Sequence, residues 1–127
     1  MFGYILYAAL GGAIGASLRY MTTTYVASVW GNLFPYGTMA VNVIGSFIMG
    51  ILFVLFAEKL NLSSDAWKVL LMTGVLGGFT TFSAFSLDAW QLIERQAYIS
   101  ALSYIGLSFL LSIGALILAI YITRSVS

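Results

Sequence analysis

Charged residues divide the chain into four long apolar runs. Five Lys or Arg and four Asp or Glu are spread over 127 residues, and the neutral runs between them are 18, 38, 19 and 28 residues long. A helix that crosses a bilayer needs about 20 apolar residues. The longest run contains the only proline, in the turn-like stretch Asn32-Leu33-Phe34-Pro35-Tyr36-Gly37, which divides it. The pattern therefore predicts four transmembrane helices, at Phe2–Val26, Thr38–Ala57, Ala66–Trp90 and Ala97–Thr123.

The composition agrees with a membrane environment. Hydrophobic residues make up 61% of the chain and charged residues 7%, whereas a soluble domain has about 25% charged residues. We therefore expect an all-α membrane protein, a single four-span domain over residues 1–127 in contact with lipid. The absence of Cys and His excludes thiol and imidazole chemistry and argues against an enzyme. Five scattered basic residues argue against a nucleic-acid partner.

The basic residues give almost no signal for orientation. With four spans, one side of the membrane would carry Lys59, Lys68 and Arg124, and the other Arg19 and Arg95. An excess of one is a very weak positive-inside signal. Either another determinant sets the orientation, or the chain inserts both ways. Insertion in both orientations would permit an antiparallel, dual-topology homodimer with its two-fold axis in the membrane plane.

The third predicted span contains a poor helix interior. The glycine pair at 77 and 78 closely precedes two β-branched threonines, Thr80 and Thr81. A broken helix would free backbone carbonyls at membrane depth, where lipid cannot satisfy them. In an antiparallel dimer, two such breaks would meet near mid-membrane and could surround one cation with oxygen atoms. The alternative is a helix that is only kinked for packing.

Aromatic and hydroxyl residues recur at helical spacing in the last two predicted spans. Phe79, Phe82 and Phe85 repeat every three residues, which would place them on one broad face of a resumed helix. A polar stripe runs along the fourth span at steps of four, and two donors begin the second span. These polar residues are Ser100, Tyr104, Ser108, Ser112, Thr38 and Asn42. Hydroxyl and amide donors facing positive ring edges favour an anion. The alternative for both sets is packing and interhelical hydrogen bonding.

Three motifs carry a family resemblance. They are Gly15-x-x-x-Arg19, Gly37-Thr38-x-x-x-Asn42 and the run from Gly74 to Ser86, which reads Gly-x-x-Gly-Gly-x-Thr-Thr-Phe-Ser-x-Phe-Ser. With them the chain resembles the Fluc (CrcB) family of bacterial fluoride channels over essentially its whole length. The resemblance implies a dual-topology antiparallel homodimer in the bacterial inner membrane, with two pores and a central structural sodium ion.

The resemblance also implies roles by position. Phe82 and Phe85 look like the residues that present ring edges to fluoride, and Gly77 and Thr80 like the carbonyl ligands of sodium. Tyr104, Ser108 and Ser112, together with Thr81, look like the polar track. Asn42 and Arg19 look like vestibule residues that help to recruit the anion. One departure from the family pattern is Ala84, which stands where the family commonly has Thr.

The expected function is passive export of cytoplasmic fluoride. A negative-inside membrane potential of 100 mV drives an anion outward with about 2.3 kcal/mol per charge. The carboxylates nearest the apolar interior, Glu58, Asp88 and Glu94, are expected at span ends. Their position argues against a proton-coupled carrier, which needs a buried ionisable group. The alternatives are a small dual-topology exporter of the multidrug type and a non-conducting packing subunit.

Overall fold

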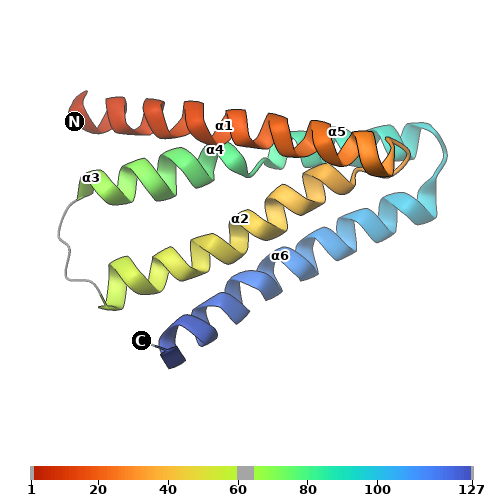
Figure 1. Ribbon diagram of the computed structural model, residues 1–127. Coiled ribbons are helices and arrows are strands. Elements are labelled where there is room, and N and C mark those ends of the chain that lie inside the picture. The colour runs from red at the N-terminus through yellow and green to blue at the C-terminus, as the bar shows by residue number, and fades with distance from the viewer. Residues whose placement is uncertain (1, 60–64, 127) are drawn as a thin grey trace.

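The computed structural model describes residues 2–59 and 65–126, and they form an antiparallel bundle of long helical segments (Figure 1). The start of α1 and the end of α6 lie at the same end of the bundle. The elements in chain order are α1 (Phe2–Trp30), α2 (Tyr36–Val54), η1 (Leu55–Lys59), α3 (Asp65–Lys68), η2 (Val69–Leu76), α4 (Gly77–Phe79), α5 (Phe82–Glu94) and α6 (Tyr98–Val126). The η segments are π-helical and continue their neighbouring α-helices.

Three helical segments in the described chain are long and apolar enough to cross a membrane. They are Tyr36–Glu58, Asp65–Glu94 and Tyr98–Val126. The first two contain the second and third predicted spans, and the last contains the fourth except for its first residue, Ala97. The first predicted span lies within α1, which has 29 residues and is long enough. Glycines, threonines, tyrosines and Arg19 make α1 less apolar than the other three. Its membrane crossing therefore stays a prediction, although α1 runs along the bundle like the other helices (Figure 1).

The connection between α1 and α2 is the turn that the sequence predicts around Pro35. Gly31 has a φ of 83°, a left-handed conformation that glycine adopts without strain. Its N–H donates to the Ala27 carbonyl at 2.8 Å and closes the last turn of α1. Pro35 then occupies the N-cap position, directly before Tyr36, the first residue of α2. The predicted loop from Glu58 to Asp65 falls largely on residues 60–64, which lie outside the described part.

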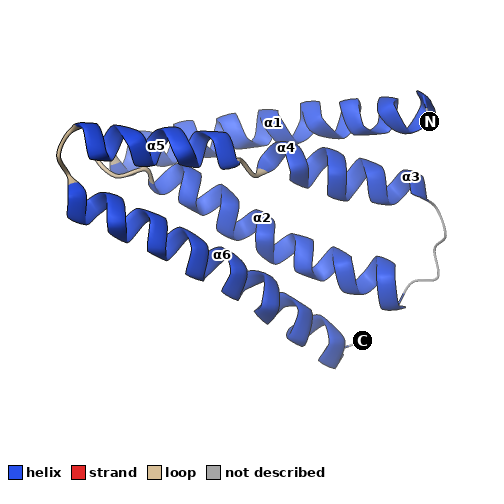
Figure 2. Cartoon of the chain, turned by 180° about the vertical axis from the view of Figure 1, so that it is seen from behind, coloured by secondary structure: helices blue, strands red, loops and turns tan. Residues whose placement is uncertain are grey.

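The chain is not helical between α4 and α5. Thr80 (φ −83°, ψ 157°) and Thr81 (φ −153°, ψ 119°) are both extended, and a short loop separates the two helices (Figure 2). Thr81 starts α5 as its N-cap, because its Oγ1 accepts the Ala84 N–H at 3.1 Å. Two extended residues and a new cap mean that α5 takes its direction and rotation independently of α4.

Glycines allow α1 to lie directly against η2 and α4. A Cβ on Gly74 would lie 2.8 Å from the Gly11 Cα, and a Cβ on Gly78 would lie 2.7 Å from the Gly12 carbonyl oxygen. Gly50 of α2 is similar, since its Cβ would lie 2.6 Å from the Leu116 carbonyl oxygen of α6. Small residues at such spacing let helix backbones approach closely. These glycines therefore fix the distances between the helices that surround the interruption.

A first prediction concerns these contacts. Gly74→Ala should destabilise the protein by about 1–3 kcal/mol, because the added methyl group meets α1 backbone that cannot move aside. Gly114→Ala is the matched control, because nothing lies within 4 Å of its Cβ position in the described chain. It should leave stability unchanged or raise it by up to about 1 kcal/mol. Thermal unfolding in detergent measures both, and equal midpoints would contradict the packing role.

Candidate functional site

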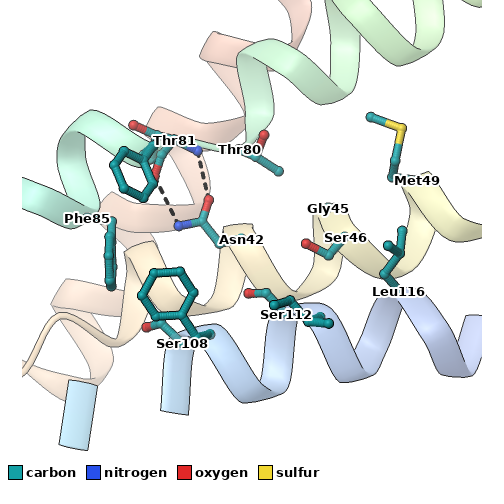
Figure 3. Close-up of a pocket in the computed structure, with 13 residues that line it drawn as sticks. Asn42, Gly45, Ser46, Met49, Thr80, Thr81, Phe85, Ser108, Ser112 and Leu116 are labelled. Carbon is teal, nitrogen blue, oxygen red and sulfur yellow. Dashed lines mark hydrogen bonds between the residues drawn. The ribbon is translucent and has the colours of Figure 1, made fainter. Parts of the chain in front are cut away.

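A pocket of about 370 Å³ lies beside the interruption, between α2, α5 and α6 (Figure 3). Hydroxyl, amide and aromatic groups line one end of it, and methionine and aliphatic side chains the other. The lining residues are Asn42, Gly45, Ser46, Met49, Thr80, Thr81, Phe82, Phe85, Ser108, Phe109, Ser112, Ile113 and Leu116. The fold thus brings together six residues assigned to the anion path from sequence, namely Asn42, Thr81, Phe82, Phe85, Ser108 and Ser112.

Asn42 makes two hydrogen bonds to the backbone of Thr81 (Figure 3). Its Nδ2 donates to the Thr81 carbonyl oxygen at 3.0 Å, and its Oδ1 accepts the Thr81 N–H at 2.7 Å. The carboxamide therefore replaces the helical partners that an extended residue lacks. Only one Nδ2 hydrogen remains for a ligand in the pocket.

The carbonyl groups of Gly77 and Thr80 lack their usual helical donors, because the Thr81 and Ala84 N–H groups donate to side-chain oxygens instead. In a continuous helix the Thr81 N–H would donate to the Gly77 carbonyl, but here it donates to Asn42. The N–H and hydroxyl of Thr80 both donate to the Leu76 carbonyl at 2.9 Å. Gly77 itself is exposed, and its Cβ position approaches only the Met72 carbonyl oxygen, at 3.7 Å. Nothing within the described chain therefore requires glycine at position 77.

Phe82 and Phe85 contact each other in the first turn of α5, with ring centroids 5.6 Å apart. Phe85 is buried against Tyr104 at 5.2 Å and meets Phe109 nearly edge-on at 5.6 Å. The Phe82 side chain is 70% exposed. Phe79 lies before the interruption, beside Gly45, and does not line the pocket. The expectation that all three phenylalanines share one face is therefore wrong, because two extended residues change the rotation of α5.

Ser108 presents a buried hydroxyl to the pocket without a protein partner. The residue is 6% exposed, and its Oγ has no hydrogen-bond partner among the described residues. A buried hydroxyl without a partner is unfavourable unless another molecule satisfies it. Ser112 lines the same pocket one turn further along α6. These two positions place donors opposite Phe85, as the four-residue spacing on α6 predicts.

Tyr104 and Thr38 lie beside the pocket rather than in its wall. Tyr104 is fully buried, and its hydroxyl donates to Asp88 Oδ2 at 3.1 Å. The buried Thr38 side chain also interacts with the Tyr104 hydroxyl. Sequence reasoning missed Asp88 as a partner of the polar stripe. The available signal was its spacing, because Asp88 follows Phe85 by three residues and so shares its helical face.

Arg19 does not reach the pocket, whose wall contains no residue of α1. A second pocket, of about 290 Å³, carries charged groups instead, from Asp88, Glu94 and Arg95, together with Asn32, Pro35 and Gln91. Arg95 is held there by a 2.7 Å hydrogen bond from Nη2 to the Leu33 carbonyl oxygen. The vestibule role that the resemblance implies for Arg19 therefore stays a prediction.

Apolar helices of membrane-crossing length around a pocket of hydroxyl, amide and aromatic groups define a multi-pass helical membrane protein. The pocket offers neutral donors, and no group of three or more His, Cys, Asp or Glu side chains that could hold a metal ion occurs among the described residues. Such a lining can donate hydrogen bonds to a small ligand, and the residues that line the pocket include no His, Cys, Lys, Asp or Glu.

The chain belongs to the CrcB family, because residues 6–120 match the family described as CrcB-like protein, Camphor Resistance (CrcB). It is 53% identical over 116 residues to a protein of Cereibacter sphaeroides named fluoride-specific ion channel FluC, covering 91% of this chain and 90% of the relative. Relatives of the same name in Caulobacter vibrioides and Chelativorans sp. are 45% identical over 122 residues and 47% identical over 123 residues. These alignments cover 96% and 97% of this chain and 96% and 98% of the relatives.

A second prediction compares two buried hydroxyl groups. Ser108→Ala should leave the free energy of unfolding unchanged within about 0.5 kcal/mol, because the hydroxyl has no protein partner to lose. Tyr104→Phe should lower it by about 1–3 kcal/mol, because it removes a hydrogen bond to a carboxylate. Tyr98→Phe, at an exposed position on the same helix, is the control. Thermal unfolding in detergent would contradict this assignment if Ser108→Ala were the more damaging change.

Proposed function

We propose that the protein is a passive, fluoride-selective channel that exports fluoride from the bacterial cytoplasm. The single structural observation that carries the proposal is the unpartnered, buried Ser108 hydroxyl facing a pocket whose wall includes Phe85. The names of relatives that are 45–53% identical over nearly the whole chain support it. They also favour a channel over the alternative of a multidrug-type exporter.

The chemistry of the pocket suits a small, strongly hydrated anion. Ser108, Ser112 and the remaining Asn42 amide hydrogen are neutral donors that can replace water around fluoride. The edge of Phe85 is the positive part of its quadrupole and also favours an anion. Since the membrane potential drives anions outward from a negative interior, export requires neither ATP nor a proton gradient.

A second copy of the chain, in the opposite orientation, is the partner we propose. The pocket wall is incomplete in one chain, because Phe82 is 70% exposed at its rim. Gly77 is exposed, and packing within its own chain does not explain a glycine there. Close approach of another backbone would explain it. The nearly equal distribution of basic residues favours both insertions, and each dimer would then contain two pores surrounded by lipid.

We further propose that a structural sodium ion lies at the centre of this dimer, held by the Gly77 and Thr80 carbonyls of both copies. The donor set fits, because the Thr81 and Ala84 N–H groups, which would pair these carbonyls in a continuous helix, donate to Asn42 and to the Thr81 hydroxyl instead, and lipid cannot supply other donors. Neutral oxygen ligands suit a monovalent cation, since no carboxylate offsets the cost of desolvating a divalent ion.

A third prediction tests transport itself. Purified protein in liposomes should release fluoride about tenfold or more faster than chloride, and an imposed pH gradient should not change the final fluoride distribution. Ser108→Ala should slow fluoride release while the protein remains folded, because only the pocket loses a donor. Protein-free liposomes correct for leakage of HF. A steady state that follows the pH gradient would instead indicate proton coupling and refute a passive channel.

A fourth prediction tests the dimer and its ion. Gly77→Val should weaken both dimer formation and fluoride release, because a side chain at this exposed glycine would separate the two copies. Thr73→Val introduces the same side chain one turn earlier, at another exposed position, and should be tolerated. Sizing in detergent measures the dimer, and anomalous scattering after exchange of sodium for thallium locates the ion. A crystal of the dimer with no cation on its axis would refute the sodium site.

A further inference from the structure

The two extended residues of the interruption both contact α2. Thr81 is held by the two hydrogen bonds of Asn42, at 3.0 and 2.7 Å. Thr80 is held one turn further along, where its methyl group occupies the space that a Cβ on Gly45 would need. Because Asn42 and Gly45 are three residues apart on one helix, they present a single face to the interruption. Thr80 also keeps its hydrogen bonds to Leu76, so the side-chain hydrogen bonds from α2 act on Thr81, the residue that begins α5.

An uninterrupted helix is the competing conformation for this segment. In that conformation the Thr81 N–H would donate to the Gly77 carbonyl, and the chain would keep the rotation of α4 through Phe85. Extended backbone at Thr81 is stable in an apolar environment only if its N–H and carbonyl find other partners. The Asn42 carboxamide satisfies both groups at once. Its amide therefore biases the segment toward the interrupted form.

The interrupted form has consequences on both sides of Thr81. Before Thr81, the Gly77 carbonyl lacks its usual helical donor, the Thr81 N–H, which donates to Asn42 instead. After it, α5 begins a new rotation that buries Phe85 against Tyr104 and leaves Phe82 at the pocket rim. A substitution of Asn42 would thus alter both the aromatic wall of the pocket and the pairing of the Gly77 carbonyl, although Asn42 lies on a different helix.

We propose that Asn42 is a positioning residue that holds the third helical segment interrupted, and that this function is separate from any contact it makes with an anion. The proposal rests on the proposed channel function. In this proposal the carboxamide binds the backbone N–H and carbonyl of Thr81, and one Nδ2 hydrogen is still available to the pocket.

Distances across the interruption test this role without any transport assay. The chain contains no Cys, so Thr73→Cys and Leu87→Cys, both at exposed positions, can carry a pair of spin labels. The protein is reconstituted in lipid with an excess of unlabelled chains, so that each dimer holds one labelled copy. A continuous helix is shorter than one with two extended residues by up to about 4 Å. Asn42→Ala should therefore shorten or broaden the distance distribution.

The matched control is Ser46→Ala, which removes a polar group from the same pocket and the same helix without touching Thr81. It should leave the distances unchanged. Asn42→Asp provides a rescue that simple loss of packing does not predict. At about pH 7.5 the introduced carboxylate cannot donate to the Thr81 carbonyl, whereas at about pH 3.5, below the ordinary Asp pKa of about 3.9, a protonated carboxyl can both donate and accept. Its distances should resemble those of Asn42→Ala at the higher pH and those of the parent protein at the lower.

Unchanged distances in Asn42→Ala would overturn the proposal and leave Asn42 as a direct ligand only. A shift in Asn42→Asp that persists at the lower pH would also overturn it, because the effect would then come from packing. Fluoride release by Asn42→Ala should fall by about tenfold or more, since misplaced groups are costly. If the parent protein itself does not release fluoride, the proposed function fails, while the distance measurements still decide the role of Asn42.

Discussion

Backbone hydrogen bonding in an apolar environment is the constraint on which the rest of the structure depends. A helix satisfies its own N–H and carbonyl groups, and lipid offers no substitute where the helix stops. At Thr80 and Thr81 the chain is extended. Thr80 keeps its helical hydrogen bond to the Leu76 carbonyl, whereas both backbone groups of Thr81 are paired by the Asn42 side chain, and the Thr81 hydroxyl accepts the Ala84 N–H. Because Thr81 bonds Asn42 instead of its own helix, α5 can begin with a new rotation. The pocket lies beside this point.

Close packing of glycines keeps the interruption in place. On one side, Gly74 and Gly78 lie against α1, with Cβ positions 2.8 and 2.7 Å from its backbone. On the other side, Gly45 receives the Thr80 methyl group. In lipid there is little hydrophobic driving force between helices, so such close contacts supply much of their association. Gly77 differs, because its own chain leaves it exposed and without a close contact at its Cβ position other than the Met72 carbonyl oxygen.

The features that local sequence determined are those with a local physical cause. The spacing of charges located three apolar helices, and the stretch from Asn32 to Gly37 with its single proline located the turn before α2. Four-residue spacing placed Ser108 and Ser112 together on α6, and both line the pocket. The glycine and threonine composition of residues 77–81 indicated weak helix there. The motifs that resemble the Fluc (CrcB) family pointed to the family that the comparison then established.

Only the tertiary structure decided which residues act together across helices. The residues around Asn42 in the sequence do not indicate its hydrogen bonds to Thr81, 39 residues away, because a carboxamide can bond many different donors and acceptors. Phe79 separates from Phe82 because the interruption resets the helix rotation, which a three-residue period cannot reveal. Asp88 pairs with Tyr104 because α6 runs back alongside α5. The sequence by itself determined helices, turns and a family, since these depend on neighbouring residues, whereas the pocket depends on contacts between distant ones.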